Sequence, residues 1–420
     1  MLRLLQCHFA FGRNIVSLSW EGAKGIAMAV AVGANLCAQP MKAQIPTGSL
    51  ALGGNVNERF HWATPQILEQ THTTWVRGFM PASEFISGER SYENDPGLRA
   101  LNTSADSGHK IVLSIKWDST GRGGFGRIPT PESKEEKAAF AFVDHLLDAT
   151  TGKLSALVLL NELSIDTLAP DLDPDANGHI PLVEFLKRLA AHIAIEHRTA
   201  ANGSPLPLFA GGMTRLDKQA TQNAPATLAM IAWINSDQRI AGADFHMHQP
   251  DMTTTQIALE FMHEAIPNKP LMVTEMSLIW KWQKHLEDSI GASLAGVDFC
   301  KKYGLIEHTT VAEFLNAAFQ RPVTESEWQD FLASQVWFEG HYLANLVPMM
   351  QSKGVKIATY ALTWNPNPQD APERMPITPK TAPWFLNQLL VPGMAVVPGA
   401  NRLPENYGLF SDYVRYQSAF

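Results

Sequence analysis

The chain has 420 residues, of which 45% are hydrophobic and 18% charged, with 27 prolines and 29 glycines. These proportions are typical of a globular chain with one large or two ordinary domains, and they exclude a disordered tail protein, a collagen-like repeat and a coiled coil. The 33 basic and 41 acidic residues give a net charge of -8, and no stripe of Lys or Arg could follow a phosphate backbone. We therefore do not expect nucleic acid as a partner.

Residues 1–43 predict a secretory signal peptide. Basic residues precede the apolar run 25–38, and small residues follow it, with cleavage expected near Ala38 or Ala43. The run is too short to span a bilayer comfortably, so stable membrane insertion is not expected and the mature protein would be secreted or periplasmic. Cleavage would leave Cys300 as the only cysteine and hence no internal disulfide. The alternative interpretation is a buried N-terminal helix.

Short apolar segments of strand character follow from residue 48 onward, separated by longer stretches. Several of these stretches, such as 135–147 and 182–197, have apolar residues at helical spacing. Strands that alternate with helices are typical of a parallel sheet. The eight predicted strands are Ser49–Val56, Thr74–Met80, Lys110–Asp118, Ser155–Asn161, Leu206–Met213, Ala243–His248, Pro270–Glu275 and Val355–Trp364.

Eight such units predict an α/β fold, a closed (β/α)8 TIM barrel in a single domain that spans residues 44–420. An open doubly wound sheet is the alternative, but no predicted strand is followed by a GxGxxG turn that begins a helix. About 80 residues separate the seventh and eighth strands, so we expect a helical insertion at about 278–328, between strand 7 and helix 7, that overhangs the active face. Residues 393–420 are predicted to be a surface tail packed on the barrel.

Two glutamates stand at strand ends, where barrel enzymes keep their catalytic groups. Glu162 follows Asn161 after the fourth strand, and Glu275 ends the seventh. Carboxyl ends of these strands face each other across the mouth of a barrel. A separation of about 5 to 5.5 Å between two such carboxyl groups suits a retaining glycosidase, and about 6.5 to 9.5 Å an inverting one.

An Asn-Glu pair after strand four and a Glu at strand seven resemble the signature of clan A, the retaining (β/α)8 glycoside hydrolases that include cellulase-like, mannanase-like and xylosidase-like families. The resemblance covers about residues 48–390 through short motifs and identifies no single family. It implies that Glu162 is the general acid/base, that Glu275 is the nucleophile, and that Asn161 binds the sugar 2-hydroxyl. No cofactor is needed for this chemistry.

The resemblance extends to other predicted substrate-binding residues. Arg77, on strand two, matches the arginine that holds the nucleophile ionised, although an arginine that bridges loops is the alternative. Trp364, which ends strand eight, matches the aromatic platform beneath the reacting sugar. Trp117 and Trp280 are further candidates, because a tryptophan face stacks on the C–H face of a pyranose, but each could equally be a core residue.

The sixth strand departs from the pattern of the clan. Many members end this strand in His-x-Tyr, whereas this sequence has His246-Met247-His248. His248 would stand where the tyrosine contacts the nucleophile, and a histidine titrates near neutral pH. His246 would line the donor-sugar subsite or contact Glu162.

This pair of histidines also suggests a second class of function. A metal-dependent barrel hydrolase could use His246 and His248, with Glu275 or Asp118 as a further ligand. The metal-binding His-x-His pairs of such barrels usually lie on the first strand, which has no histidine here. A carbohydrate-binding barrel without catalysis is a third possibility, although the presence of both glutamates argues against it.

Residues 173–185 match the calcium-binding loop of an EF-hand in register. The predicted Ca²⁺ ligands are oxygen-bearing groups at Asp173, Asp175 and Asn177, a position at His179 and a bidentate Glu184, with a glycine at the sharp turn. No helix plainly enters the loop, so the ion would be structural. The alternative is an acidic loop that caps the next helix. The sequence thus predicts a secreted retaining glycoside hydrolase that acts on β-linked poly- or oligosaccharides.

Overall fold

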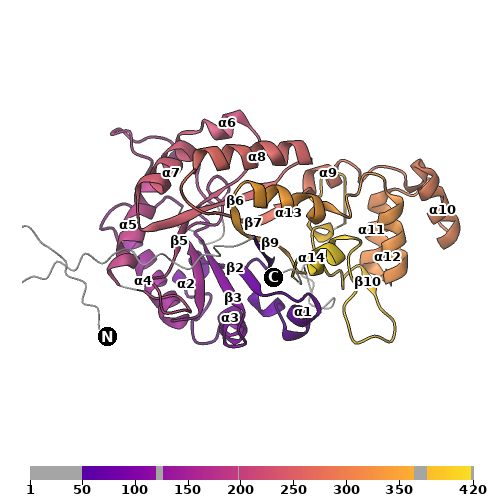
Figure 1. Cartoon of the computed structure of the whole chain (residues 1–420), viewed down its shortest axis with the longest axis horizontal. Coiled ribbons are helices and arrows are strands. Elements are labelled where there is room, and N and C mark those ends of the chain that lie inside the picture. Colours follow the sequence, from indigo (N-terminus) through magenta and orange to yellow (C-terminus); the bar gives the residue numbers. More distant parts are fainter. Residues whose placement is uncertain (1–49, 120–125, 197, 364–375, 418–420) are drawn as a thin grey trace, which may run out of the picture. The chain divides into compact units, whose positions relative to one another are not determined.

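Eight parallel strands form a closed barrel with helices around it (Figure 1). A computed structural model describes residues 50–119, 126–196, 198–363 and 376–417. The first strand pairs with the last, which closes the sheet and excludes the open doubly wound alternative. The barrel strands, in spatial order, are β1 (Ala51–Asn55), β2 (Trp75–Pro81), β3 (Lys110–Lys116), β4 (Leu154–Val158), β5 (Leu208–Met213), β6 (Ile240–His248), β7 (Leu271–Ser277) and β9 (Val355–Ala361).

The predicted (β/α)8 fold is confirmed, and each of the eight predicted segments overlaps a barrel strand. The differences lie at the strand ends. The predicted fourth strand was extended to Asn161, whereas β4 ends at Val158, so Asn161 and Glu162 belong to the loop above the barrel. The prediction placed Glu275 at the end of its strand, yet β7 continues to Ser277.

The barrel interior is filled by side chains from six of its strands. Alternate residues of a strand point to opposite faces, so one set packs inside the barrel and the other packs against the helices. The inner set forms a separate hydrophobic cluster of bulky residues. This layer closes the floor beneath the polar groups at the carboxyl ends of the strands. Its members are Trp75, Val112, Ala156, Val158, Phe209, Met272 and Ile357.

Amphipathic helices cover the outside of the barrel (Figure 1). The predicted helical stretches at 135–147 and 182–197 correspond to α4 and α5. The Ser133 side chain caps α4 by accepting the backbone N–H of Glu136, and α5 begins with Pro181, which lacks an N–H to satisfy. The helices up to strand β7 are α1 (Pro65–Gln70), α2 (Ala82–Ile86), α3 (Pro96–Asp106), α4 (Lys134–Ala149), α5 (Pro181–Ile195), α6 (Gln219–Gln222), α7 (Pro225–Ser236) and α8 (Met252–Ala265).

Four helices lie between β7 and α13 (Tyr342–Ser352). Their apolar residues belong to the same hydrophobic core that packs against the outside of the barrel, and within it the rings of Phe314 and Phe331 stack with centroids 4.1 Å apart. The short strand β8 (Val323–Thr324) pairs with β10 (Ala395–Val396). That this segment overhangs the active face stays a prediction. The four helices are α9 (Ile279–Gln283), α10 (Leu294–Tyr303), α11 (Val311–Gln320) and α12 (Glu325–Ser334).

The C-terminal segment ends in a helix, α14 (Leu409–Gln417), that packs against α13 and β1. The buried hydroxyl of Tyr413 lies 2.8 Å from that of Thr73, just before β2. Gln417 donates a hydrogen bond to the carbonyl of Leu52 in β1. These contacts hold the end of the segment on the barrel.

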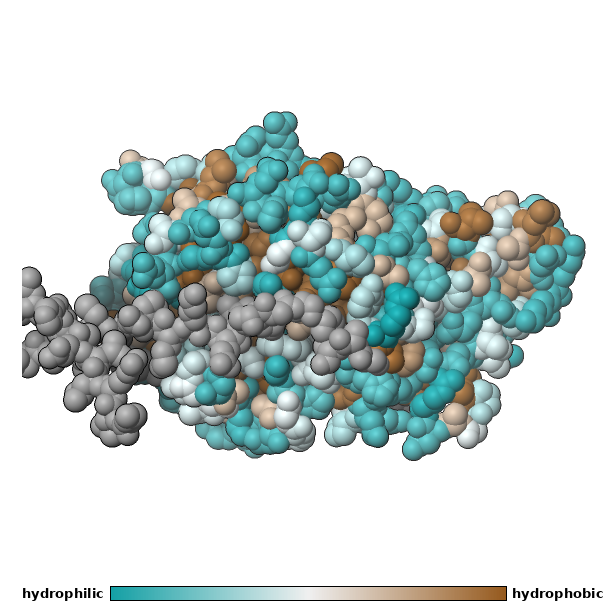
Figure 2. All heavy atoms as spheres, viewed as in Figure 1, coloured by the Kyte–Doolittle hydropathy of each residue, from teal (hydrophilic) through white to brown (hydrophobic). Residues whose placement is uncertain are grey.

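The visible surface is largely hydrophilic, with apolar residues in separate patches (Figure 2). Within the described parts of the chain, no helix is long and apolar enough to cross a membrane. The predicted signal peptide, residues 1–43, lies outside the described residues.

Candidate active site

A cavity of about 530 Å³ opens beside the carboxyl ends of the barrel strands. Its wall includes Asn55 from the end of β1, Glu275 from β7 and His248 from the end of β6. Polar groups from at least three strands therefore meet at the place where barrel enzymes carry their catalytic residues.

A shift in strand pairing sets the position of Glu275. The pairing of β6 with β7 runs from Phe245 opposite Val273 to His246 opposite Glu275, so Thr274 is the extra residue of an irregularity on β7. Irregularities of this kind re-aim a side chain and are common next to active sites. Here the shift places the carboxylate of Glu275 directly across from His246.

Glu275 is held in its ionised form. One carboxylate oxygen accepts a hydrogen bond of 2.5 Å from the Arg77 guanidinium, and the other lies 3.4 Å from Nε2 of His248. Burial alone would raise the pKa of Glu275, but the charges of His246 and Arg77 and the hydrogen bond from His248 outweigh burial and hold the pKa well below its usual range. A carboxylate that stays ionised can act as a nucleophile.

Arg77 is the fully buried centre of the polar network. Besides Glu275, its guanidinium donates to Oδ1 of Asn161 at 2.6 Å, to Oδ1 of Asn55 at 3.2 Å and to the hydroxyl of Ser114 at 3.2 Å. A buried guanidinium needs such a set of acceptors, since an unpaired one would cost several kcal/mol. Arg77 thereby ties together strands β1, β2, β3 and β7 and the loop after β4.

The loop after β4 is fixed by a buried carboxylate at Asp166. Asp166 accepts hydrogen bonds from the side-chain amide of Asn161 and from the backbone N–H of Glu162, both at 3.1 Å. Its own backbone carbonyl accepts from the backbone N–H of Ser119 after β3. The Oδ1 atom of Asn161 accepts a hydrogen bond from Arg77, and its Nδ2 atom donates one to Asp166. These two bonds fix the orientation of the Asn161 carboxamide. The predicted bond from Asn161 to a sugar 2-hydroxyl stays a prediction.

His246 lies between the two glutamates. Its Nδ1 is 3.2 Å from Oε1 of Glu162 and 4.0 Å from Oε2 of Glu275, so these two oxygens are separated by at most the sum of the two distances, about 7 Å. Both glutamate side chains are partly exposed, at 16% and 15%. The predicted facing arrangement of the carboxyls is therefore present in the structure, and His246 contacts Glu162 as expected.

A second buried carboxylate lies behind His246. Nε2 of His246 is 3.1 Å from the hydroxyl of Thr274 and 3.7 Å from Asp244, and Thr274 in turn donates to Asp244 at 2.8 Å. Burial would lower the pKa of His246, but Glu275, Asp244 and Glu162 outweigh it and raise the pKa to about 10. A protonated imidazole at this position offsets the charges of the surrounding carboxylates.

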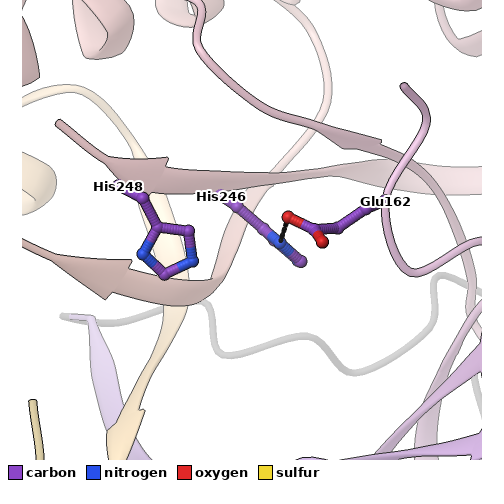
Figure 3. A group of neighbouring side chains, drawn as sticks. All are labelled: Glu162, His246 and His248. Carbon is purple, nitrogen blue, oxygen red and sulfur yellow. Dashed lines mark hydrogen bonds and ion pairs between the residues drawn. The ribbon is translucent and has the colours of Figure 1, made fainter. Parts of the chain in front are cut away.

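His248 takes the place expected for it beside Glu275. Its Nδ1 lies 2.8 Å from the hydroxyl of Ser277, and its ring meets the edge of Trp384 with centroids 5.0 Å apart. Figure 3 shows His246 and His248 projecting from the same strand, with Glu162 reaching His246 from the other side.

Sequence reasoning missed two of the buried carboxylates in this network. Asp244 is a charged residue within the part of β6 before His246 that is otherwise apolar, and that is a signal that could have identified it. Asp166 stands four residues after Glu162 in a polar loop, where nothing in the sequence distinguishes it from a solvated residue. The structure buries both of them.

The burial of Asp166 predicts a pH-dependent change in stability. Burial raises the pKa of Asp166 from 3.8 to about 6, against the lowering effects of Lys116 and Asn161. A raised pKa means that stability present below pH 4 is lost as the pH rises to 6. In Asp166→Asn this loss is absent, so its free energy of unfolding relative to the wild type should rise by about 2 kcal/mol between pH 4 and pH 7. Urea unfolding at both pH values measures this difference, and an unchanged difference would contradict it.

The three tryptophans predicted to contact a sugar lie in different surroundings. Trp117 is fully buried, donates its N–H to the carbonyl of Leu159 and packs edge-on against Phe185. The structure therefore corrects the expectation that Trp117 contacts a sugar, because a core position leaves no face for a ligand. Trp280, in α9, is half-buried and is not part of the cavity wall. Trp364 lies outside the described residues.

The EF-hand-like loop does not gather its predicted ligands in this structure. The Asp175 carboxylate accepts the backbone N–H groups of Asn177 and His179, and Glu184 pairs with Lys187 at 2.6 Å. Asp173 is exposed. These side chains are engaged with their own loop and helix in the absence of an ion, and calcium binding stays a prediction.

Chelation tests the calcium prediction. If Ca²⁺ clips this loop, EDTA should lower the melting temperature by several degrees and reduce activity, and added Ca²⁺ should restore both. Differential scanning fluorimetry of the wild type and of Glu184→Gln checks this. Equal melting temperatures with EDTA and with Ca²⁺ would contradict the prediction that this loop binds calcium.

Comparisons with known proteins show a likeness of fold. No family model matches the sequence, and no curated protein matches it. The GH53 catalytic domain of Ignisphaera aggregans matches in structure with a TM-score of 0.50 and 14% identity, over 88% of this chain and 97% of that one. A thermostable mutant of a xylanase from Cellvibrio japonicus matches with a TM-score of 0.47 and 11% identity, over 89% and 99%. An exo-beta-1,4-mannosidase from Opitutaceae bacterium strain TAV5 matches with 0.47 and 13%, over 88% and 60%.

Proposed function

We propose that this chain is a retaining glycoside hydrolase that cleaves β-glycosidic bonds of a poly- or oligosaccharide. One observation carries the proposal: two partly exposed glutamates from different walls of the barrel both lie within 4.0 Å of the imidazole of His246, and Glu275 is in addition paired with Arg77. Two carboxyl groups in unequal surroundings supply the acid and the nucleophile that glycoside cleavage needs. The fold likeness to a GH53 catalytic domain agrees with this class of enzyme.

In the first step, Glu162 donates its proton to the departing oxygen while Glu275 attacks the anomeric carbon. The glycosidic C–O bond breaks, and an ester bond forms between the sugar and Glu275. The positive charge of Arg77, at 2.5 Å, keeps the attacking carboxylate ionised and oriented. Asn161 and Asp166 fix the backbone that carries Glu162.

In the second step, Glu162, now ionised, removes a proton from water, and the water oxygen attacks the anomeric carbon. The ester bond to Glu275 breaks, the carboxylate is regenerated, and Glu162 regains its proton. Two displacements at one carbon retain the β configuration of the released sugar.

The bound of about 7 Å on the oxygen separation is compatible with the shorter spacing of retaining enzymes. The stereochemistry of the product tests this. Proton NMR during hydrolysis should show the β anomer of the new reducing end first, with the α anomer appearing only by mutarotation. Early formation of the α anomer would indicate an inverting enzyme and contradict the role of Glu275.

A metal-dependent hydrolase is a second candidate, because Glu162, His246 and His248 form a group whose potential ligand atoms lie within 4.8 Å of one another (Figure 3). Asp118, which the sequence suggested as a further ligand, is not in this group. The ring nitrogens of both histidines already have partners in Thr274, Ser277 and the two glutamates. Activity that EDTA abolishes and Zn²⁺ restores would favour this candidate over the glycosidase.

We also propose that the protein is exported. The support comes from the basic, apolar and small-residue order of residues 1–43. N-terminal sequencing of protein from the culture medium or periplasm should show cleavage after Ala38 or Ala43, and an intact N-terminus in the cytoplasm would contradict export.

A further inference from the structure

Two histidines of β6 and the glutamate of the loop after β4 form a compact group of metal-binding side chains (Figure 3). One potential ligand atom from each of Glu162, His246 and His248 lies within 4.8 Å of the other two, and Nδ1 of His246 is 3.2 Å from Oε1 of Glu162. In a tetrahedral zinc site with bonds of about 2.0 to 2.1 Å, the ligand atoms lie about 3.3 to 3.4 Å apart. A rotation of the partly exposed Glu162 side chain can close the remaining difference of at most about 1.4 Å.

Glu275 supplies a further oxygen beside this group. Its Oε2 lies 3.4 Å from Nε2 of His248 and 4.0 Å from Nδ1 of His246. These separations are close to the edge of a zinc tetrahedron, so an ion between the two imidazoles has this oxygen within reach as well. Two imidazoles with one or two carboxylates are a ligand set that suits Zn²⁺, Ni²⁺ and Cu²⁺, whereas Mg²⁺ and Ca²⁺ prefer oxygen ligands alone.

Each imidazole is oriented by a partner on its other ring nitrogen. Nε2 of His246 lies 3.1 Å from the hydroxyl of Thr274, which donates to the buried Asp244 at 2.8 Å. Nδ1 of His248 lies 2.8 Å from the hydroxyl of Ser277. Histidines that bind metals in proteins almost always have such a partner, because it fixes the ring and its tautomer. The two nitrogens that face the glutamates are therefore oriented to bind an ion.

The charges around His246 favour a divalent cation. The carboxylates of Glu162, Asp244 and Glu275 lie within 4.0 Å of its ring nitrogens, and Arg77 pairs with one of them, Glu275. His246 must release its proton to bind a metal ion, and the ion then takes the place of that proton. The carboxylates attract a charge of +2 about twice as strongly as the single charge of a proton, and this attraction offsets the cost of the exchange.

An ion can reach this group from the cavity. His248 and Glu275 line the cavity wall, and the Glu162 side chain is 16% exposed, whereas His246 is fully buried and would be the innermost ligand. The group depends on His248, which stands where many clan A members have a tyrosine. Tyrosine is not among the common zinc ligands. The metal site is therefore a feature of this chain and does not follow from its resemblance to the clan.

We propose that Glu162, His246 and His248 form an inhibitory site for a transition-metal ion such as Zn²⁺. The ion takes the carboxylate of Glu162 as a ligand, and a coordinated carboxylate has no proton to donate to the departing oxygen. This inference rests on the proposed glycosidase function. It is the opposite of the metal-dependent candidate, since the ion stops the reaction instead of catalysing it.

Binding and inhibition are measured on the full-length protein after treatment with EDTA and removal of the chelator. Isothermal titration calorimetry with Zn²⁺ should show a tightest binding event with a stoichiometry near one. Hydrolysis of an aryl glycoside should fall over the same range of Zn²⁺ concentration, recover when EDTA is added, and be unaffected by Mg²⁺. Co²⁺ in place of Zn²⁺ should develop the visible absorption of a tetrahedral site.

Three variants locate the ion. His248→Phe keeps an aromatic ring but removes a ligand, so it should weaken Zn²⁺ binding and raise the Zn²⁺ concentration for half inhibition, each by at least about 10-fold. Ser277→Ala keeps every ligand but removes the partner that orients His248, and it should weaken binding by about 10- to 100-fold. His308→Gln is the matched control, since His308 is exposed on the helical insertion, and it should bind Zn²⁺ like the wild type.

Calorimetry measures binding whether or not a variant is active, so the metal site and the proposed function are tested separately. Unchanged Zn²⁺ binding in His248→Phe would overturn the inference, as would activation of hydrolysis by Zn²⁺. Hydrolysis by a wild type that binds no Zn²⁺ would support the proposed function and overturn the metal site. A wild type that hydrolyses no glycoside but binds Zn²⁺ through His248 would reject the proposed function, and the calorimetry would still support the metal site.

Discussion

Replacing Glu275 by alanine should lower kcat by about 10⁵-fold, because it removes the group that attacks the anomeric carbon. The small side chain also leaves room for an external anion. Azide or formate should therefore restore part of the activity on aryl glycosides with good leaving groups, and the product should be the α-glycosyl adduct, formed by a single inversion. Release of nitrophenol and NMR of the adduct measure both effects.

Glu264→Ala is the matched control, since Glu264 is an exposed glutamate on α8. It should retain wild-type kcat. Full activity in Glu275→Ala would reject the nucleophile role. Two results together would support the metal-dependent alternative. No anion would rescue the inactive Glu275→Ala variant, and EDTA would abolish the activity of the wild type.

Replacing Glu162 by alanine should have an effect that depends on the leaving group. Substrates with poor leaving groups need proton donation and should lose about 10²- to 10⁴-fold in kcat/KM. Substrates with activated leaving groups should form the glycosyl-enzyme at nearly normal rates and then accumulate it, because no base activates water. Rapid-mixing kinetics should show a burst of released phenol.

Azide should accelerate turnover of Glu162→Ala and give the β-glycosyl azide, since it attacks the ester intermediate from the side that water uses. The adducts of the two variants thus have opposite configurations, which distinguishes the two glutamates without reference to rate. An equal loss on good and poor leaving groups would contradict the acid/base role of Glu162.

The barrel was predictable because it follows from local signals. Each strand is a short apolar run bounded by polar or turn residues, and α4 and α5 have apolar residues at helical spacing. Glu162 and Glu275 could be singled out because strand ends converge in a parallel barrel. The match of Arg77 to Glu275 came from the resemblance to clan A, and the structure shows the pair at 2.5 Å.

Features that depend on exact register were not predictable. The shift that sets Glu275 opposite His246 leaves no mark in the sequence. The burial of Asp166 follows from the path of a loop, and the burial of Trp117, just after β3, follows from α4 and α5, which pack Phe142 and Phe185 against it. The sequence of the loop at 173–185 matches the EF-hand pattern. The match could not predict that Asp175 and Glu184 form hydrogen bonds within their own segment.

The most direct test is to identify the residue that becomes bonded to the sugar. Wild-type protein incubated with an activated 2-deoxy-2-fluoro β-glycoside of its best substrate should be inactivated and should gain the mass of one fluorosugar. After proteolysis, mass spectrometry should place that mass on Glu275. A label on any other residue, or rapid turnover of the fluorosugar with no label, would contradict the account.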